Sequence, residues 1–325
     1  MAKRHYPERY RRFKGCFGSS LTKAQYFRYE TVELAGRLSM NDECLNEILN
    51  SLNTVMNNPE TVLDMRKIES VNLACGLLLK SFFDEFLITH DVKPRMRSPN
   101  SAKIRAIFNY LEIARYQDVK NHHYKDIDCW QIKSWEQEDN LNFSRLLHEE
   151  IIPRCWNGSH AMSPNSANIA SSVAETLNNC KEHAYTGNKE AIAFKRWYLG
   201  VGEYPDTKSF NFCVYDKGVG IKTRMKESPK IWHKVVDLNK TDSQMIILAT
   251  QGRSGADKKA GRGEGLKTAI ELLESNDGRL DIYSDYGYFS TDDEKSGVDR
   301  KTYLEGTMVA FSFPIQYTLK EGKKI

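Results

Sequence analysis

One junction constrains the fold of this chain more than any other feature: an apolar, strand-like run that leads directly into an aspartate and two glycines. Residues 210–215 favour a strand, and Asp216, Gly218 and Gly220 follow it. Glycine lets the backbone approach a ligand closely, and an aspartate at a strand end can accept a hydrogen bond from an exocyclic amine. An ordinary turn can have the same composition, so this segment indicates a binding site only in combination with other motifs of the chain.

A second glycine cluster opens a predicted helix over residues 266–273. The N–H groups at such a helix start, together with the positive end of the helix dipole, favour an anion, most naturally phosphate. The residues of this segment are Gly261, Gly263, Gly265 and Leu266, with the nearby basic residues Arg253, Lys258, Lys259 and Arg262. A loop this basic is suited to close over a triphosphate, although a solvated loop with ordinary glycines has the same pattern.

A carboxylate, an amide and an imidazole recur at helical spacing upstream of both glycine clusters. Within a predicted helix over residues 166–185, Glu175, Asn179 and His183 are four residues apart and project from one face. This set suits a site where an acid orients a water molecule and an amide oxygen holds Mg²⁺. Taken alone, the stripe also fits the solvated face of an amphipathic helix.

Two other nucleotide motifs fail on spacing. A Walker-type loop needs a lysine directly after its last glycine, but Leu266 separates Gly265 from Lys267. The dinucleotide motif must follow the first strand of a βαβ unit, and neither glycine cluster does so.

In their order along the chain, these segments resemble the GHKL ATP-binding superfamily of gyrase, heat-shock chaperone, histidine kinase and MutL. The pattern is E-x-x-x-N on a helix, D-x-G-x-G after a strand, G-x-G-x-G-L before a helix, and finally Gly306-Thr307. The first box ends in His-Ala-Tyr, as in the anti-sigma-factor serine kinases. The resemblance implies a Bergerat-type two-layer α/β sandwich over residues 144–318, a mixed sheet with helices on one face.

The resemblance also implies roles for individual residues, with ATP and Mg²⁺ as cofactors. Glu175 would be the catalytic carboxylate, Asn179 the Mg²⁺ ligand, and Asp216, assisted by Thr307, the group that recognises the adenine amine. Residues implied to contact the rest of the nucleotide are His183, Gly218, Gly220, Arg253, Lys258, Lys259, Gly261, Arg262, Gly263, Gly265 and Leu266. Cys180 stands where the family has alanine, a small-for-small change.

The N-terminal half reads as an α/β unit with a mostly parallel sheet. Helices are expected near 40–52, 76–87 and 101–111, and strands near 61–66 and 92–96. The segment around Ala74, Cys75 and Gly76 is similar to STAS domains, the antagonists that anti-sigma-factor kinases phosphorylate. The phosphoacceptor serine of that family would lie at Cys75, so the acceptor hydroxyl is missing here.

Composition and charge bound the remaining possibilities. The 325 residues suit about two domains, and the net charge of +4 is too small to indicate nucleic acid by itself. No apolar run is long enough to span a membrane, and the basic N-terminus lacks the apolar core of a secretory signal. The seven cysteines form no C-x-x-C pair, which favours reduced thiols and a cytoplasmic location.

The expected organisation has five parts. These are a basic arm over 1–28, a STAS-like domain over 29–120, a connecting segment over 121–143, the ATP-binding domain over 144–318 and a tail over 319–325. His122 and His123 in the connection lack further metal ligands at fixed spacing. A helix is expected near Leu141, at the start of the ATP-binding domain, and strands are expected near 279–284 and 307–313 towards its end.

Two functions follow from these expectations. The first is an ATP-hydrolysing regulator whose nucleotide state controls contacts between its domains or with a partner protein. The second is a protein serine kinase that acts on a separate STAS partner. A histidine kinase would need a helical hairpin around its acceptor, which the polar surroundings of His122 do not provide. Homodimerisation through the basic arm, and contact of that arm with a polyanion, stay open.

Overall fold

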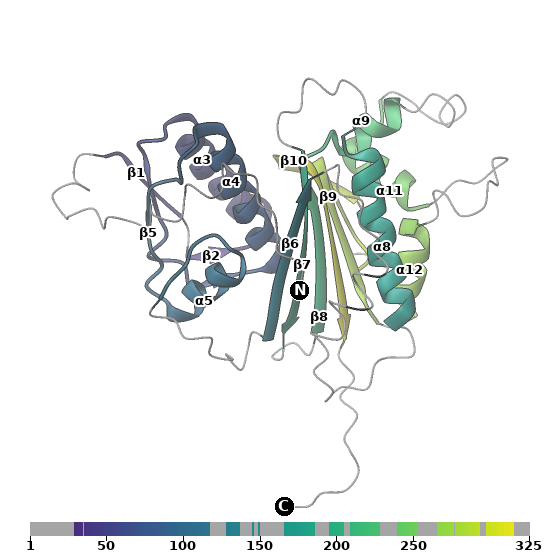
Figure 1. The fold of residues 1–325 in the computed structure, drawn as a ribbon. Helices are drawn as coiled ribbons and strands as arrows, with labels where there is room; N and C mark the ends of the chain where they lie inside the picture. The colour runs from purple at the N-terminus through teal and green to yellow at the C-terminus, as the bar shows by residue number, and fades with distance from the viewer. Residues whose placement is uncertain are drawn as a thin grey trace, which may run out of the picture.

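The chain combines a parallel sheet near its N-terminus with an antiparallel sheet in its C-terminal part, so it belongs to the mixed α/β class. A computed structural model describes residues 29–34, 36–117, 128–136, 145, 149, 166–185, 195–204, 209–227, 239–251, 265–275, 277–292 and 297–314. The arm over 1–28 and the tail over 319–325 lie outside these residues. Figure 1 shows the large sheet at the centre, between the N-terminal elements on one side and a layer of helices on the other.

The N-terminal unit alternates strands and helices as expected. Its parallel sheet has the order β1-β3-β5, beside a small pair β2-β4. The strands are β1 (Thr31–Glu33), β2 (Arg37–Leu38), β3 (Val62–Asp64), β4 (Ser70–Val71) and β5 (Met96–Arg97), and the helices are α3 (Asp42–Asn57), α4 (Leu73–His90) and α5 (Ala102–Tyr110). The predicted helices and parallel sheet of this half are therefore confirmed.

Short polar side chains set where these helices begin. Asn41 accepts a hydrogen bond from the Cys44 N–H at 2.8 Å, and Asn72 accepts one from the Cys75 N–H at 2.8 Å. Ser101 does the same at the start of α5. Each cap satisfies an N–H that the first helical turn leaves without a partner, and of the two candidate caps Asn41 and Asp42 it is Asn41 that caps the start of α3.

The central sheet has the order β6-β7-β8-β10-β9, and every described pairing in it is antiparallel. Its strands are β6 (Asp128–Glu136), β7 (Arg196–Tyr204), β8 (Ser209–Asp216), β9 (Arg279–Ser290) and β10 (Gly297–Pro314). The expectation of a mixed sheet is therefore wrong for these strands. β8 and β9 do run in the same direction and are joined through helices, but β10 lies between them, so no parallel neighbours form.

Helices cover both faces of this sheet, so the expectation of helices on one face is incomplete. On one face lie α8 (Ser166–His183), α9 (Gly220–Glu227), α11 (Asp242–Thr250) and α12 (Gly265–Glu274). The other face is covered by α4, which contacts β7 and β8, and by α3, which contacts β10. The central sheet is therefore covered by helices on both faces, and the helices on one face belong to the N-terminal unit, whose own sheet lies beyond them (Figure 1).

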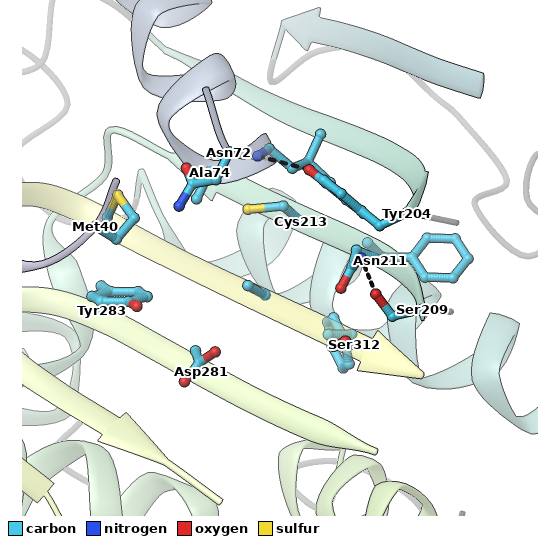
Figure 2. Close-up of a pocket in the computed structure, with 14 residues that line it drawn as sticks. Met40, Asn72, Ala74, Tyr204, Ser209, Asn211, Cys213, Asp281, Tyr283 and Ser312 are labelled. Carbon is cyan, nitrogen blue, oxygen red and sulfur yellow. Dashed lines mark hydrogen bonds between the residues drawn. The ribbon is translucent and has the colours of Figure 1, made fainter. Parts of the chain in front are cut away.

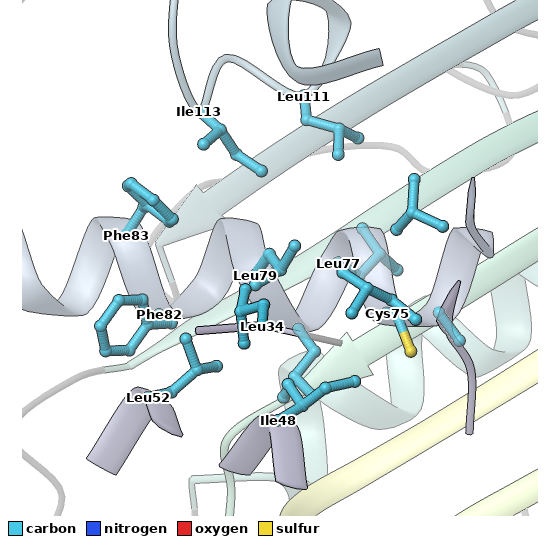
Figure 3. Close-up of a cluster of buried hydrophobic side chains, with 14 of the residues drawn as sticks. Leu34, Ile48, Leu52, Cys75, Leu77, Leu79, Phe82, Phe83, Leu111 and Ile113 are labelled. Carbon is cyan, nitrogen blue, oxygen red and sulfur yellow. The ribbon is translucent and has the colours of Figure 1, made fainter. Parts of the chain in front are cut away.

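The alternation of side chains along the strands explains how both faces are buried. On β7, Trp197 and Leu199 belong to the core under α8 and α12, whereas the intervening Tyr198 belongs to the core of the N-terminal unit. Gly200 leaves room for α4, since a side chain there would approach Leu73 to 2.7 Å. Figure 3 shows the N-terminal core, in which side chains of α3 and α4 interdigitate.

The segment 121–143, expected to be a simple connection, contains the edge strand β6, which pairs with β7. This part of the expectation is wrong. Its polar residues gave no clear period, but an edge strand pairs on one side only and tolerates such a mixed pattern. The helix expected near Leu141 lies outside the described residues apart from Arg145 and Glu149.

Leu77→Ala tests whether α4 is part of the core that includes the sheet. Leu77 is fully buried on α4, so its truncation leaves a cavity and is expected to lower the free energy of unfolding by about 2–5 kcal/mol. Urea denaturation measures this. Ile88→Ala on the same helix is the control, because Ile88 is half exposed. Equal losses in the two variants would contradict the described packing of α4.

Candidate functional site

The predicted carboxylate stripe lies on α8, which packs against β8 and α12. Glu175 and Asn179 are both half-buried, one helical turn apart. The backbone of His183 ends the helix, and its side chain lies outside the described structure. Glu175 and Asn179 are therefore partly accessible, as a side chain that contacts a ligand must be.

Glu175 has an environment that favours its protonated form. Burial raises the pKa of its carboxyl, and the nearby charge of Glu182 adds to the effect. A carboxylate whose pKa is shifted toward neutrality is better suited to accept a proton from water than an exposed one. The position can thus supply a general base.

Asp216, the last residue of β8, is almost fully buried. Its Oδ1 accepts a hydrogen bond from the Gly218 N–H at 2.8 Å, and its Oδ2 accepts one from the Cys180 thiol at 3.4 Å. Thr307 faces it across the β8–β10 pair, and the Thr307 N–H also donates to it. Burial outweighs these hydrogen bonds and raises the pKa of Asp216 to about 6. The Cys180 contact joins the carboxylate directly to the Glu175–Asn179 helix.

Three glycines near Asp216 are required by the packing of the chain on itself. A Cβ at Gly218 would lie 2.2 Å from the Ala184 carbonyl oxygen, and one at Gly306 would lie 1.9 Å from the Asp216 carbonyl oxygen. Gly306 has φ +84° and Gly220 has φ +76°, a region that favours glycine. These residues let α8, the end of β8 and the middle of β10 meet closely, which explains their spacing without any ligand.

Ser284 on β9 ties the remaining strand to this cluster. Its hydroxyl accepts a hydrogen bond from the Ile221 N–H at 2.9 Å and donates one to the Gly306 carbonyl at 3.1 Å. The same oxygen lies 3.3 Å from the Thr307 hydroxyl. Ser284 was not predicted, because a lone serine within a strand carries no signal in the sequence.

Two further residues escaped prediction as parts of this cluster. The Tyr185 hydroxyl accepts a hydrogen bond from the Lys217 N–H at 3.2 Å and donates one to the Arg196 carbonyl. Lys217 itself forms ion pairs with Glu85 and Glu305. Tyr185 is the last residue of the His-Ala-Tyr motif, so the sequence offered a signal for it. No motif near Lys217 indicated that it pairs with Glu85 and Glu305.

The second glycine segment is described only at its end. Gly265 begins α12, and Leu266 is half-buried against the core that α8 and α12 share. The other predicted residues of this segment lie outside the described residues: Arg253, Lys258, Lys259, Gly261, Arg262 and Gly263. Helix α12 thus begins at Gly265, as expected. The chain order of α8, the end of β8 and α12 also agrees with the expectation.

The position expected for a STAS acceptor is closed. Cys75 is fully buried in the first turn of α4, and burial raises the pKa of its thiol well above the usual range. Cys75 and α8 lie on opposite faces of the central sheet, because α4 packs on the face of β7 and β8 that the N-terminal unit covers. The four described cysteines, Cys44, Cys75, Cys180 and Cys213, are all unpaired thiols.

A cavity of about 280 Å³ lies where the start of α4 meets the sheet. Figure 2 shows Asn72, the N-cap of α4, and Ala74 in its first turn above Tyr204, Cys213 and Asp281 of the sheet. None of the predicted site residues lines it. It is therefore separate from the Asp216 cluster, on the other face of the sheet.

No protein-family model matches the chain, and no curated protein matches it. The described residues include no cluster of three metal-ligating side chains, and no described helix has the length and apolar character to cross a bilayer. The site consists of a buried carboxylate at a strand end, beside a helix that carries a carboxylate and an amide.

The raised pKa of Asp216 predicts a defined pH dependence of stability. Its folded pKa of about 6 lies above the unfolded value of about 3.9, so its contribution is fully present below pH 4 and is lost as the pH rises through 6. The Asp216→Asn variant has no ionisable group at this position, so its free energy of unfolding does not include this pH-dependent decrease. The free energy of unfolding of the variant minus that of the wild type should therefore rise by roughly 2–3 kcal/mol between pH 4 and pH 7.

Urea denaturation at a series of pH values measures this difference. Asp292→Asn, an exposed aspartate on the loop after β9, is the control and should give a difference that does not rise in this window. A flat difference for Asp216→Asn would show that its carboxylate is not held in a desolvated site.

Proposed function

We propose that the protein binds ATP with Mg²⁺ through a GHKL-type site, hydrolyses it with Glu175 as general base, and uses its nucleotide state to control contacts of its domains or a partner protein. The observation that carries the proposal is the Asp216 cluster. A buried carboxylate at the end of β8 is linked by Cys180 to the helix that bears Glu175 and Asn179. The fit of these groups to the roles implied by the motifs supports the proposal.

The adenine role of Asp216 follows from its chemistry. A carboxylate accepts about four hydrogen bonds, and protein donors take three of these positions, one of them a weak thiol. An exocyclic amine can take the remaining one or displace the thiol. Because the ionised form is the stronger acceptor, adenine binding is expected to weaken as the pH falls below about 6.

The donor set on α8 fits a hard divalent cation. The Asn179 amide oxygen and the Glu175 carboxylate lie one turn apart on a half-buried face, and Mg²⁺ prefers such oxygen ligands. Bound Mg²⁺ would neutralise charge on the phosphates. Asn179 would hold it, while Glu175 would orient a water molecule and accept its proton during attack on the terminal phosphate.

The start of α12 supports a place for the phosphates. Its first turn, at Gly265 and Leu266, is on a helix that packs along α8. The N–H groups of such a start attract anions, and the basic residues that precede it in the sequence add positive charge. We propose that this end of α12 faces the phosphates and that the basic segment closes over them.

Transfer of phosphate to the protein's own N-terminal unit is not part of this proposal. In the STAS-like interpretation of that unit, the acceptor position is Cys75, which is buried on the opposite face of the sheet. A water molecule, rather than an internal side chain, is the acceptor that this arrangement favours. In the kinase alternative, the acceptor is a separate STAS-type protein. Release of free phosphate indicates hydrolysis, whereas phosphate bound to that protein indicates the kinase.

Glu175→Gln tests the catalytic role. The amide retains the size of the carboxylate but accepts no proton, so phosphate release should fall by roughly 10²–10⁴-fold while ATP affinity changes little. Phosphate release and calorimetric ATP binding in the presence of Mg²⁺ measure the two effects. Glu271→Gln, at an exposed glutamate of α12, is the control and should retain activity.

The outcomes separate the candidate functions. Wild-type protein that binds no ATP would refute the site, and phosphate release unaffected by Glu175→Gln would refute the role of Glu175. Binding of ATP without release of phosphate, together with labelled phosphate on a STAS-type protein encoded beside this chain, would favour the kinase instead.

A further inference from the structure

Asp216 and the residue after it point to opposite faces of the central sheet. Asp216 accepts a hydrogen bond from Cys180 of α8, whereas the side chain of Lys217 reaches Glu85 of α4. Successive side chains of a strand alternate in this way, and the alternation persists to the end of β8. One short stretch of backbone therefore joins the candidate adenine carboxylate to the N-terminal unit.

The Lys217 ammonium is held by two carboxylates. Its Nζ lies 2.5 Å from Oε2 of Glu85 on α4 and 2.8 Å from Oε2 of Glu305 on β10. The Lys217 side chain is 14% exposed and that of Glu85 is 25% exposed, so water screens this pair less than a surface pair. Burial alone would lower the pKa of Lys217, but Glu305 and Glu85 more than offset it and raise the pKa.

Glu305 directly precedes Gly306 and Thr307, the β10 residues that meet Asp216. Lys217 directly follows Asp216, and Glu305 lies two residues before Thr307 on β10, so the Lys217–Glu305 ion pair lies next to the Thr307–Asp216 pair. Glu85 adds the third element, α4, to a junction that already contains β8 and β10. A displacement of α4 would remove one of the two charges that fix Lys217.

A second set of contacts connects α4 to the same backbone. Asp84 accepts hydrogen bonds from the Tyr198 hydroxyl at 3.2 Å and from Arg196 Nη1 at 3.5 Å. The Arg196 carbonyl accepts a hydrogen bond from Tyr185, whose hydroxyl in turn receives the Lys217 N–H. Two adjacent acids of α4 thus hold both the side chain and, through Tyr185, the backbone of Lys217.

We propose that Glu85, a residue of the N-terminal unit, is a positioning residue of the nucleotide site. It holds Lys217 and, through the shared backbone, the Asp216 carboxylate on the other face of the sheet. The inference rests on the proposed function, because it concerns the affinity of that site. The N-terminal unit is then part of the ATP site, and by linkage bound ATP strengthens the docking of α4 by the same factor.

Glu85→Gln in the full chain tests this. The variant removes one charge and keeps the shape of the side chain, and the Kd for ATP with Mg²⁺, measured by calorimetry, should rise at least about fivefold. Glu47→Gln, an exposed glutamate on α3, is the matched control and should leave the Kd unchanged. Lys217→Gln alone and combined with Glu85→Gln completes a double-mutant cycle, in which the double variant should bind no more weakly than Lys217→Gln.

Two further measurements separate positioning from a merely structural role. In the wild type, ATP should slow amide hydrogen exchange in α4, and Glu85→Gln should abolish this slowing. If Glu85→Gln does not fold, Glu85→Asp keeps the charge on a shorter side chain and should give a smaller rise in Kd.

The outcomes are distinct from those that test the site itself. A wild type that binds no ATP refutes the proposed function. A wild type that binds ATP, with a Glu85→Gln Kd within twofold of that of Glu47→Gln, overturns the positioning role and leaves the site intact. A lower melting temperature with an unchanged Kd, or additive effects in the double variant, also overturns it.

Discussion

The burial of the central sheet on both faces is the constraint on which the rest of the structure depends. Antiparallel sheets commonly leave one face to water, but here alternate residues of β7 enter two cores, with Leu199 under α8 and Tyr198 against α4. Gly200 permits this, because any side chain there would collide with Leu73. The N-terminal unit therefore covers the second face of the central sheet, and the backbone of β7 is shared by the two cores.

Local signals in the sequence predicted the elements that local interactions define. The start of α3 could be predicted because Asn41 and the apolar spacing after it act within a few residues. The lengths of β9 and β10 were underestimated, since the strands were expected near 279–284 and 307–313. The additional residues pair in a hairpin in which Phe289 and Leu304 are buried, whereas Tyr286 and Tyr303 remain exposed. The direction of pairing in the sheet depends on the insertion of β10, which no local pattern encodes.

The candidate site likewise contains residues that the sequence motifs indicated and residues that only the fold reveals. Asp216, Gly218 and Thr307 could be selected because they occupy the motif positions that carry the resemblance to the GHKL superfamily, and at Gly218 the structure adds a close backbone approach that only glycine allows. Cys180 and Lys217 could not, because their partners lie far away along the chain and are brought near only by the fold. A substitution that looks conservative in a motif, such as cysteine for alanine, can thus add a hydrogen bond that the motif does not describe.

The docking of α4 also decides which reactions the N-terminal unit can undergo. To present Cys75 to a nucleotide on the other face of the sheet, α4 would have to leave the core that it shares with Tyr198 and Tyr215. Each large apolar side chain exposed costs about 1.5–3 kcal/mol, so withdrawing four of them would cost roughly 6–12 kcal/mol. This is comparable to the whole stability of a typical domain. Such a cost keeps α4 packed on the sheet and Cys75 buried, which disfavours Cys75 as a phosphate acceptor.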